Sequence, residues 1–274
     1  MNALADPIVA IHWVTRLAGL AVFLSSLELL SLRREFLPGG FYHCDRELAR
    51  LTNRTPVTPG VWIAASLYPA FYAIIGVRLL LGVLLLLDAP TGPWRPILLF
   101  AAAAITLFIG SRLEFGMSAA DTMAGIVLCG LGFTALVPGN ALVQRMGLWF
   151  LALQTTVAYT AAGVTKLYIP AWRDGAYLAT ALGSATYGSP FAARFMRDRR
   201  LALLASWTVI VWECSFPLAL LAGAPVAIAY CALAALFHAA IGVFMGLKMF
   251  VFVFGSTYPA IVACAIQIHL LMKR

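Results

Sequence analysis

A lysine near the end of one long apolar run shares its predicted helix face with residues that could support acid–base chemistry. In the stretch QTTVAYTAAGVTKL, helical spacing relates Thr155, Tyr159, Ala162 and Lys166. Burial in an apolar pocket disfavours a charged ammonium, so a lysine in that setting can accept a proton and act as a base. A lysine at a helix end can instead extend its amine to the membrane surface. The pattern therefore indicates either a catalytic base or an interfacial anchor at Lys166.

Few other ionisable side chains fall within apolar runs, where each costs at least about 2.5 kcal/mol and needs a partner, a cavity or a function. Glu213 could pair with Arg16 or Arg78, which would be a structural role. His238 could hydrogen-bond a polar group of a ligand, although a lone histidine in an apolar helix is more often tied to a neighbouring helix. The candidate catalytic residues are Lys166 and His238, and the candidate pocket residues are Thr155, Tyr159, Glu213, Arg16 and Arg78.

The sequence lacks the patterns of common metal and nucleotide sites. No HExxH, P-loop or GxSxG stretch occurs. Cysteines in apolar runs usually pack as small apolar side chains. No CxxC pair forms among the five cysteines, which are Cys44, Cys129, Cys214, Cys231 and Cys264. We therefore predict neither a metal site nor a disulfide framework.

The elements that position these residues are predicted to be membrane helices. Apolar residues make up 62% of the 274-residue chain and charged residues only 11%, against about 25% charged residues in a typical soluble domain. Several apolar runs approach the roughly 20 residues that a membrane-spanning helix needs. We predict an all-α, polytopic integral membrane bundle of about eight spans. The expected runs are 9–32, 61–87, 96–110, 119–137, 144–168, 201–221, 226–245 and 249–271.

Two polar connections are long enough to hold short helices on the membrane surface. One follows Pro38 and continues to about Gly60, with the charges Asp45, Arg46, Glu47, Arg50 and Arg54. The other covers residues 171–200, where aromatic residues such as Trp172 and Tyr187 precede the basic string RFMRDRR. We expect a single transmembrane domain over residues 1–274, with no removable signal peptide and no extramembrane domain.

The net charge of +8 and the pI near 9.5 indicate contacts with lipid headgroups rather than with nucleic acid, because the basic residues lie in short connections between apolar runs. Most Lys and Arg residues fall in the odd-numbered connections of an eight-span chain. The positive-inside rule then predicts that both termini face away from the cytoplasm. The lipid bilayer is the expected partner, and nucleic acid is not.

Two segments resemble the vitamin K-dependent gamma-carboxylases and their bacterial relatives, the HTTM (horizontally transferred transmembrane) domain proteins. The first, QTTVAYTAAGVTKLYIPAWRDGAYL, resembles the family pattern of a tyrosine, a small-residue step, a lysine-leucine pair and a following Trp and Gly. The second, FHAAIGVFMGLKMFVFVFGSTYP, resembles the family's Phe-His, later Met-Phe and small-residue stretch. The resemblance therefore implies an HTTM-like fold in a membrane, which we expect to be the bacterial cytoplasmic membrane.

The resemblance also implies a chemistry and residue roles. Lys166 would be the base that deprotonates a reduced quinone, either menaquinol or vitamin K hydroquinone. The quinol anion would react with oxygen, and the resulting strong base would remove a γ-proton from a glutamate that captures carbon dioxide. His238 matches the family's Phe-His position and would orient the quinone or the substrate. No metal is implied.

Two departures from the family pattern leave a rival function open. Thr165 stands where the animal carboxylases have a second lysine, and we expect no counterpart of their large extramembrane C-terminal region. Short bacterial relatives are associated with the maturation of secreted peptide toxins, together with separate small proteins. The rival is thus a noncatalytic subunit that binds a peptide or a lipid for toxin-peptide maturation or immunity. A small transporter is the third hypothesis, although no inverted repeat is visible.

Overall fold

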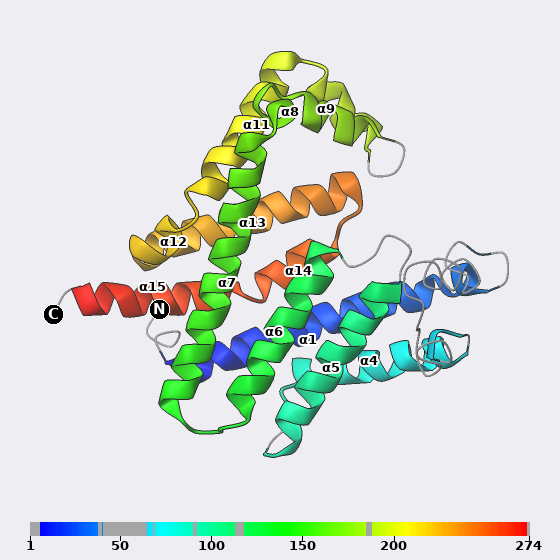
Figure 1. Cartoon of the computed structure of the whole chain (residues 1–274), viewed down its shortest axis with the longest axis vertical. Coiled ribbons are helices and arrows are strands. Elements are labelled where there is room, and N and C mark those ends of the chain that lie inside the picture. The colour runs from blue at the N-terminus through cyan, green and yellow to red at the C-terminus, as the bar shows by residue number, and fades with distance from the viewer. Residues whose placement is uncertain are drawn as a thin grey trace. The chain divides into compact units, whose positions relative to one another are not determined.

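The computed structural model describes residues 6–37, 40, 65–67, 69–89, 92–112, 118–184 and 188–272, and every regular element in these ranges is a helix (Figure 1). The chain divides into two compact units. Unit 1 combines Met1–Ile11 with Gln144–Arg274, and unit 2 is His12–Val143. Each unit is described by itself. The single domain expected over residues 1–274 stays a prediction, and the expected surface helix before Gly60 lies outside the described residues.

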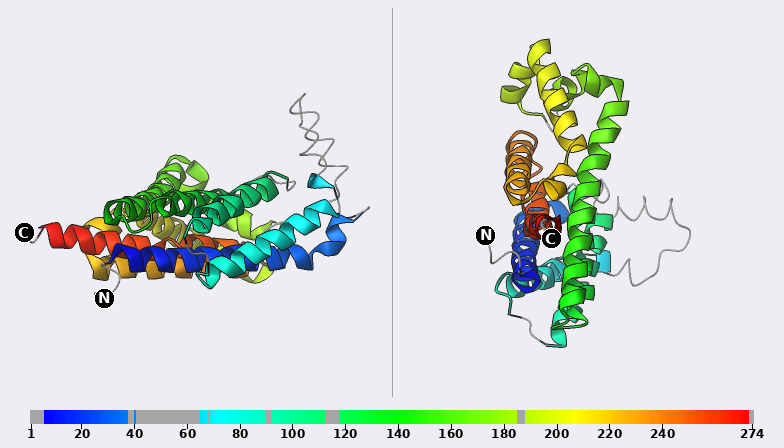
Figure 2. Two further views of the ribbon diagram at one scale, coloured as in Figure 1. Left: turned by 90° about the horizontal axis from the view of Figure 1, so that it is seen from below. Right: turned by 90° about the vertical axis from the view of Figure 1, so that its left-hand side faces the viewer.

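Unit 2 contains the greater part of α1 (Pro7–Ser31), followed by the short 3-10 helix η2 (Arg33–Phe36). Three further helices follow, namely α4 (Ala70–Leu86), α5 (Trp94–Arg112) and α6 (Ala119–Ala135). Helices α5 and α6 lie side by side (Figures 1 and 2). A capping box between Ser118 and Asp121 starts α6, because each side chain accepts a backbone N–H of the other residue.

Glycines allow α1 and α4 to approach closely within unit 2. A Cβ added at Gly82 would lie 2.6 Å from the backbone nitrogen of Phe23, and one at Gly19 would lie 2.4 Å from that of Leu86. Such small residues are typical of helix interfaces in membranes, where close backbone packing replaces the hydrophobic effect. This close approach also brings polar residues one turn away into contact, namely Ser26 on α1 and Arg78 on α4.

Unit 1 begins with α7 (Ala141–Tyr168), which enters it at Gln144 and is followed by three short helices, α8 (Pro170–Arg173), α9 (Ala176–Gly183) and α10 (Pro190–Met196). The short helices occupy the connection for which the sequence predicted surface helices. The remaining elements are α11 (Arg199–Cys214), α12 (Leu218–Leu221), α13 (Ala224–Met245), α14 (Met249–Gly255) and α15 (Tyr258–Met272).

Two of the expected apolar runs are interrupted. The run at 201–221 breaks into α11 and α12 where Pro217 lacks the N–H that a continuous helix needs. In the run at 249–271 the regular helix is interrupted between α14 and α15, where the Ser256 and Thr257 hydroxyls donate to the carbonyls of Val253 and Phe254. Both interruptions lie next to residues of the candidate site.

Four helical segments in the described ranges are long and apolar enough to cross a membrane, so the chain is an α-helical integral membrane protein. Two other apolar helices, α4 and α6, are shorter, with 17 residues each. The four long segments are Pro7–Ser31, Trp94–Arg112, Ala224–Met245 and Met249–Met272.

Candidate functional site

The long helix α7 supplies one face of the candidate site. Thr155 and Tyr159 are buried on this face, as their spacing predicts, and Lys166 lies two turns beyond Tyr159. The Thr155 hydroxyl donates to the carbonyl of Leu151 at 2.8 Å, which satisfies it within the helix. Its oxygen can still accept a hydrogen bond from another donor. Thr155 therefore contributes a buried polar group to this helix face and is not a reactive group.

Lys166 is paired with Glu213 across α7 and α11. The Nζ of Lys166 lies 2.7 Å from Oε2 of Glu213, and the two side chains are 16% and 3% exposed. The ring of Trp172 lies 5.2 Å from the same amine. Lys166 thus contacts a buried carboxylate within unit 1. The structure pairs Glu213 with Lys166, and a contact of Glu213 with Arg16 or Arg78 stays a prediction.

A glycine explains how the two partners meet. A Cβ at Gly163 would lie only 2.6 Å from the backbone nitrogen of Cys214. The absence of a side chain there allows α7 and α11 to approach one turn before Lys166. The lysine and the glutamate are therefore held at ion-pair distance by backbone packing as well as by their charges.

Tyr159 is the centre of a second polar contact on the same helix face. Its hydroxyl lies 2.7 Å from Nε2 of His238 on α13 and 3.2 Å from the hydroxyl of Tyr258 on α15. The tyrosine ring stacks on Phe216 with ring centroids 4.1 Å apart, and the ring of Trp212 lies 5.4 Å away. A hydrogen-bonded chain of His238, Tyr159 and Tyr258 therefore joins three helices within an aromatic cluster.

Two buried polar atoms of this cluster have no hydrogen-bond partner in the described part of the chain. They are Nδ1 of His238, in a residue only 3% exposed, and the indole nitrogen of Trp212, in a residue 7% exposed. A buried polar atom without a partner costs about 1–3 kcal/mol, so such atoms are uncommon and often mark functional sites. Trp212 precedes Glu213, which connects the aromatic cluster to the Lys166–Glu213 pair.

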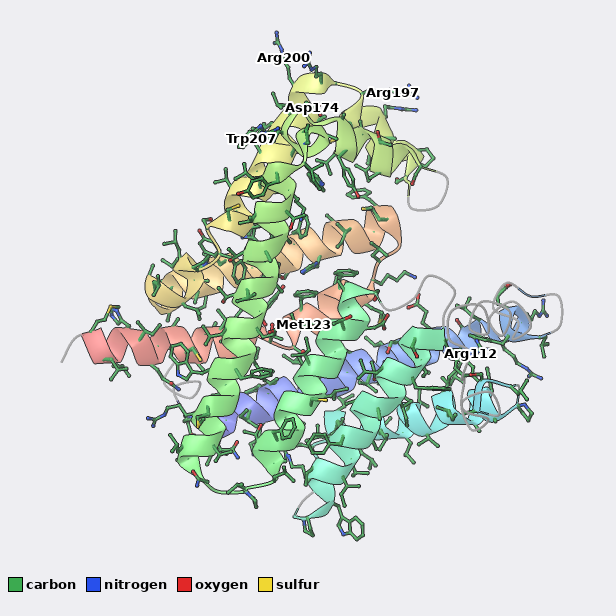
Figure 3. All side chains as sticks on the ribbon, viewed as in Figure 1. Arg112, Met123, Asp174, Arg197, Arg200 and Trp207 are labelled. Atoms are coloured by element: carbon green, nitrogen blue, oxygen red, sulfur yellow. The ribbon has the colours of Figure 1, made fainter. Side chains whose placement is uncertain are left out.

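The segment after α7 is fastened to α11. The Trp207 indole donates to the carbonyl of Arg173 at 3.1 Å. Gly175, with φ of +81°, allows close contact with the backbone of Leu203, since an added Cβ would lie 2.8 Å from its nitrogen. Figure 3 labels Trp207 on α11 beside Asp174, which precedes α9. These contacts hold Trp172 and α11 in place around the ion pair.

An apolar groove adjoins the cluster on unit 1. It has a volume of about 590 Å³ and runs between α11 and α13. Trp212 lines this groove and also contacts the ring of Tyr159. The other lining residues are Leu204, Trp207, Thr208, Val211, Ser215, Ala229, Tyr230 and Leu233.

The two arginines of the predicted pocket lie in unit 2. Arg16 is exposed, with its guanidinium 5.9 Å from the ring of Trp13. Arg78 is buried and binds three hydroxyl groups. The structure therefore brings Lys166, Glu213, Tyr159 and His238 into connected contacts in unit 1. A shared pocket with the arginines stays a prediction.

Sequence reasoning missed several residues of the site. Trp212 and Phe216 were read only as part of an apolar run, and Tyr258 as part of a matched segment. The adjacency of Trp212 to the acidic Glu213 was the one local signal for the former. Phe216 directly precedes the break at Pro217, but its stacking on Tyr159 depends on how the helices pack, which no local pattern contains.

Comparison of the chain with models of protein families, with curated protein sequences and with solved structures finds no match.

Proposed function

We propose that the chain is a membrane-embedded enzyme that uses a reduced quinone and a lysine base to modify a peptide or a small substrate, as the gamma-carboxylases that it resembles do. The observation that carries the proposal is the Lys166–Glu213 pair beside the Tyr159–His238 hydrogen bond. Both lie in unit 1 among apolar helices. An acid–base pair and a hydrogen-bonding group in apolar surroundings are what proton removal from a weakly acidic hydroxyl requires.

The unsatisfied polar atoms fit a quinol. Nδ1 of His238 and the indole N–H of Trp212 are two buried groups that ligand oxygens could satisfy, and aromatic rings surround them. His238 and Trp212 would hold the quinol. When bound, a reduced quinone would supply an ionisable hydroxyl and two electrons for a reaction with oxygen.

The chain's own residues would manage the proton. A neutral Lys166 would take the proton of the quinol hydroxyl, and the ammonium that forms would be balanced by the carboxylate of Glu213, so the pair would be neutral after the transfer. Tyr159 fixes one nitrogen of His238, which determines the other nitrogen's role. If the tyrosine donates to Nε2, then Nδ1 carries a hydrogen and is a donor to the ligand.

The number of spans and the kind of membrane are part of the same proposal. We propose about eight spans in a bacterial cytoplasmic membrane, with each of the eight apolar runs crossing once. Reporter fusions after each run test this arrangement, since successive connections should report alternating sides. Two successive connections on one side would reduce the span count.

The test of the activity is quinol oxidation by purified protein. Reduced menaquinone or vitamin K would be supplied with oxygen and bicarbonate, and epoxide formation would be followed. We expect Lys166→Ala and Glu213→Gln to abolish the product, and Lys166→Arg to do the same because a guanidinium keeps its charge. The matched control is Lys248→Ala, a lysine at the start of α14, which should retain activity. Full activity of Lys166→Ala would exclude the proposed role of the lysine.

One observation favours the noncatalytic alternative. The 590 Å³ groove offers apolar surface for a peptide or a lipid, as a subunit for toxin-peptide maturation or immunity would need. Such a subunit would form a stable complex with a separate small protein. Capture of that complex equally by the native chain and by Lys166→Ala, without epoxide formation by either, would favour this function over the enzyme.

A further inference from the structure

Three arginines in the described part of unit 2 are partly or fully buried, and their surroundings differ. Arg95 forms an ion pair with Asp88, at 2.9 Å between Nη1 and Oδ1. Arg112 donates to the carbonyl of Ser66 at 3.1 Å and lies 3.9 Å from the ring of Phe71. Figure 3 labels Arg112 on α5. Arg78, in the middle of α4, is only 4% exposed and has neither a carboxylate nor a carbonyl partner within the described part of the chain.

The partners of Arg78 are hydroxyl groups from two neighbouring helices. Nε donates to Oγ1 of Thr106 on α5 at 3.1 Å. Nη1 donates to Oγ of Ser25 at 2.7 Å and to Oγ of Ser26 at 3.2 Å, both on α1. The glycine contacts between α1 and α4 bring these serines close to α4. Arg78 is therefore held in one orientation by three neutral acceptors.

The hydroxyls cannot neutralise the charge. Each one donates its own hydrogen to a helix carbonyl, Ser25 and Ser26 to Val22 and Thr106 to Ala102. Their oxygens are thus left to accept from the guanidinium. This orients the group and partly solvates it, but the site keeps a full positive charge, since arginine is not deprotonated in proteins.

The nearby acidic residues form no direct contact with Arg78. Glu28 on α1 forms no ion pair with it, and the carboxylate of Asp121 on α6 attracts the guanidinium only through space, since it accepts the hydrogen bonds of the capping box with Ser118. The two N–H groups on Nη2 have no partner among the described residues. An unpaired buried cation costs several kcal/mol among apolar helices, and a bound anion would remove that cost.

We propose that Arg78 is the cation of a buried site for a monovalent anionic group, oriented by Ser25, Ser26 and Thr106. Nη2 keeps N–H groups that can donate to a small anion or to a carboxylate oxygen. Two sources share this chemistry. One is a free anion such as chloride, and the other is the carboxylate of a fatty acid from the bilayer.

The test is anion-dependent stability of the full chain. The protein would be purified in a neutral detergent with gluconate as the only anion, and its unfolding midpoint followed as chloride or oleate is added at constant ionic strength. We expect a saturable rise with one of the two. Saturation by chloride identifies a free ion, and saturation by oleate identifies a fatty-acid carboxylate. No rise with either would overturn the proposal.

Variants separate this site from general salt effects. Arg78→Gln should abolish the saturable rise, and the exposed control Arg16→Gln should retain it. If Arg78→Gln does not fold, the double variant Ser25→Ala and Ser26→Ala keeps the charge but loses its orientation. That variant should weaken the apparent anion affinity about tenfold, which is about 1.4 kcal/mol. An unchanged affinity in it, or a rise in Arg78→Gln equal to that of the native chain, would contradict the site.

Discussion

Units 1 and 2 accommodate buried ionisable side chains in different ways. In unit 1 the ammonium of Lys166 meets the carboxylate of Glu213, so the charges cancel within the protein. In unit 2 the guanidinium of Arg78 meets only hydroxyls, so its charge remains. In the first arrangement the protein balances its own buried charge. The second leaves a fixed charge that a bound anion would neutralise. The comparison therefore relates the proposed proton transfer to unit 1 and the proposed anion binding to unit 2.

The largest expected effect follows from removing one partner of the unit 1 pair. Glu213→Ala leaves Lys166 facing an apolar space, and we expect the free energy of unfolding to fall by about 3–5 kcal/mol. Replacing both partners, as Lys166→Met with Glu213→Leu, should restore most of the stability. Detergent or thermal unfolding measures both. A double variant as unstable as the single one would show that the pair is not the reason for the loss.

Closing the approach between α7 and α11 should have the next largest effect. Gly163→Ala places a Cβ against the backbone of Cys214, and we expect a loss of about 1–3 kcal/mol, together with loss of the Lys166–Glu213 contact. The matched control is Gly183→Ala on α9, where nothing lies within 4 Å of the added Cβ. Thermal midpoints compare the two variants. Equal midpoints would mean that helix approach does not hold the pair.

In unit 2, Asp88 tests whether a charge network can outweigh local backbone preference. It has φ of 54°, a left-handed conformation that favours glycine, and its carboxylate contacts His12 and Arg95. Local preference alone predicts that Asp88→Gly stabilises by about 1 kcal/mol. We expect it to destabilise by about 1 kcal/mol, because Arg95 loses its counter-charge.

Asp88→Asn provides the control for this prediction. Asparagine tolerates the left-handed conformation but lacks the charge, so its loss of stability should be at least as large as that of Asp88→Gly. Unfolding midpoints rank the native chain above Gly and Gly above Asn. If the glycine variant is more stable than the native chain, the ion pairs of Asp88 contribute less to stability than the local backbone preference does.

The smallest stability effect is expected at Trp212. Its indole N–H has no hydrogen-bond partner among the residues that the structure describes, so Trp212→Phe removes a polar atom without removing one of the observed hydrogen bonds. We expect stability to stay constant or to rise by up to about 1 kcal/mol, while quinol oxidation falls. Parallel unfolding and activity measurements separate the two effects. A variant unchanged in both would show that the indole N–H does not contact a ligand.

Local sequence patterns predict the helices of this chain better than its contacts. Long apolar runs and Pro or Gly breaks account for the positions of α1, α5 and α13, since hydrophobic length and helix-stopping residues are local properties. The break at Pro217 was visible in the sequence, but the apolar residues on both sides favoured one continuous run. The helix face of Thr155, Tyr159 and Lys166 also followed from spacing.

The contacts of the site depend on tertiary packing that spacing does not contain. Glu213 meets Lys166 because Gly163 allows two helices to approach, although a glycine in an apolar helix has no such meaning on its own. Tyr258 contacts Tyr159 although the two residues are 99 positions apart in the sequence, so their contact depends on how the helices pack. The hydroxyl partners of Arg78 come from helices far apart in sequence, so they were invisible before the helices were placed.

The groove between α11 and α13 changes how the chemistry of unit 1 would respond to concentration. A substrate with a hydrocarbon chain partitions into the bilayer, so entry along an apolar groove samples its mole fraction in the lipid rather than its amount per litre of buffer. Adding detergent or empty vesicles at constant total substrate would dilute it in two dimensions. The apparent Michaelis constant would then scale with the amount of lipid, as it does for enzymes that take their substrates from a surface.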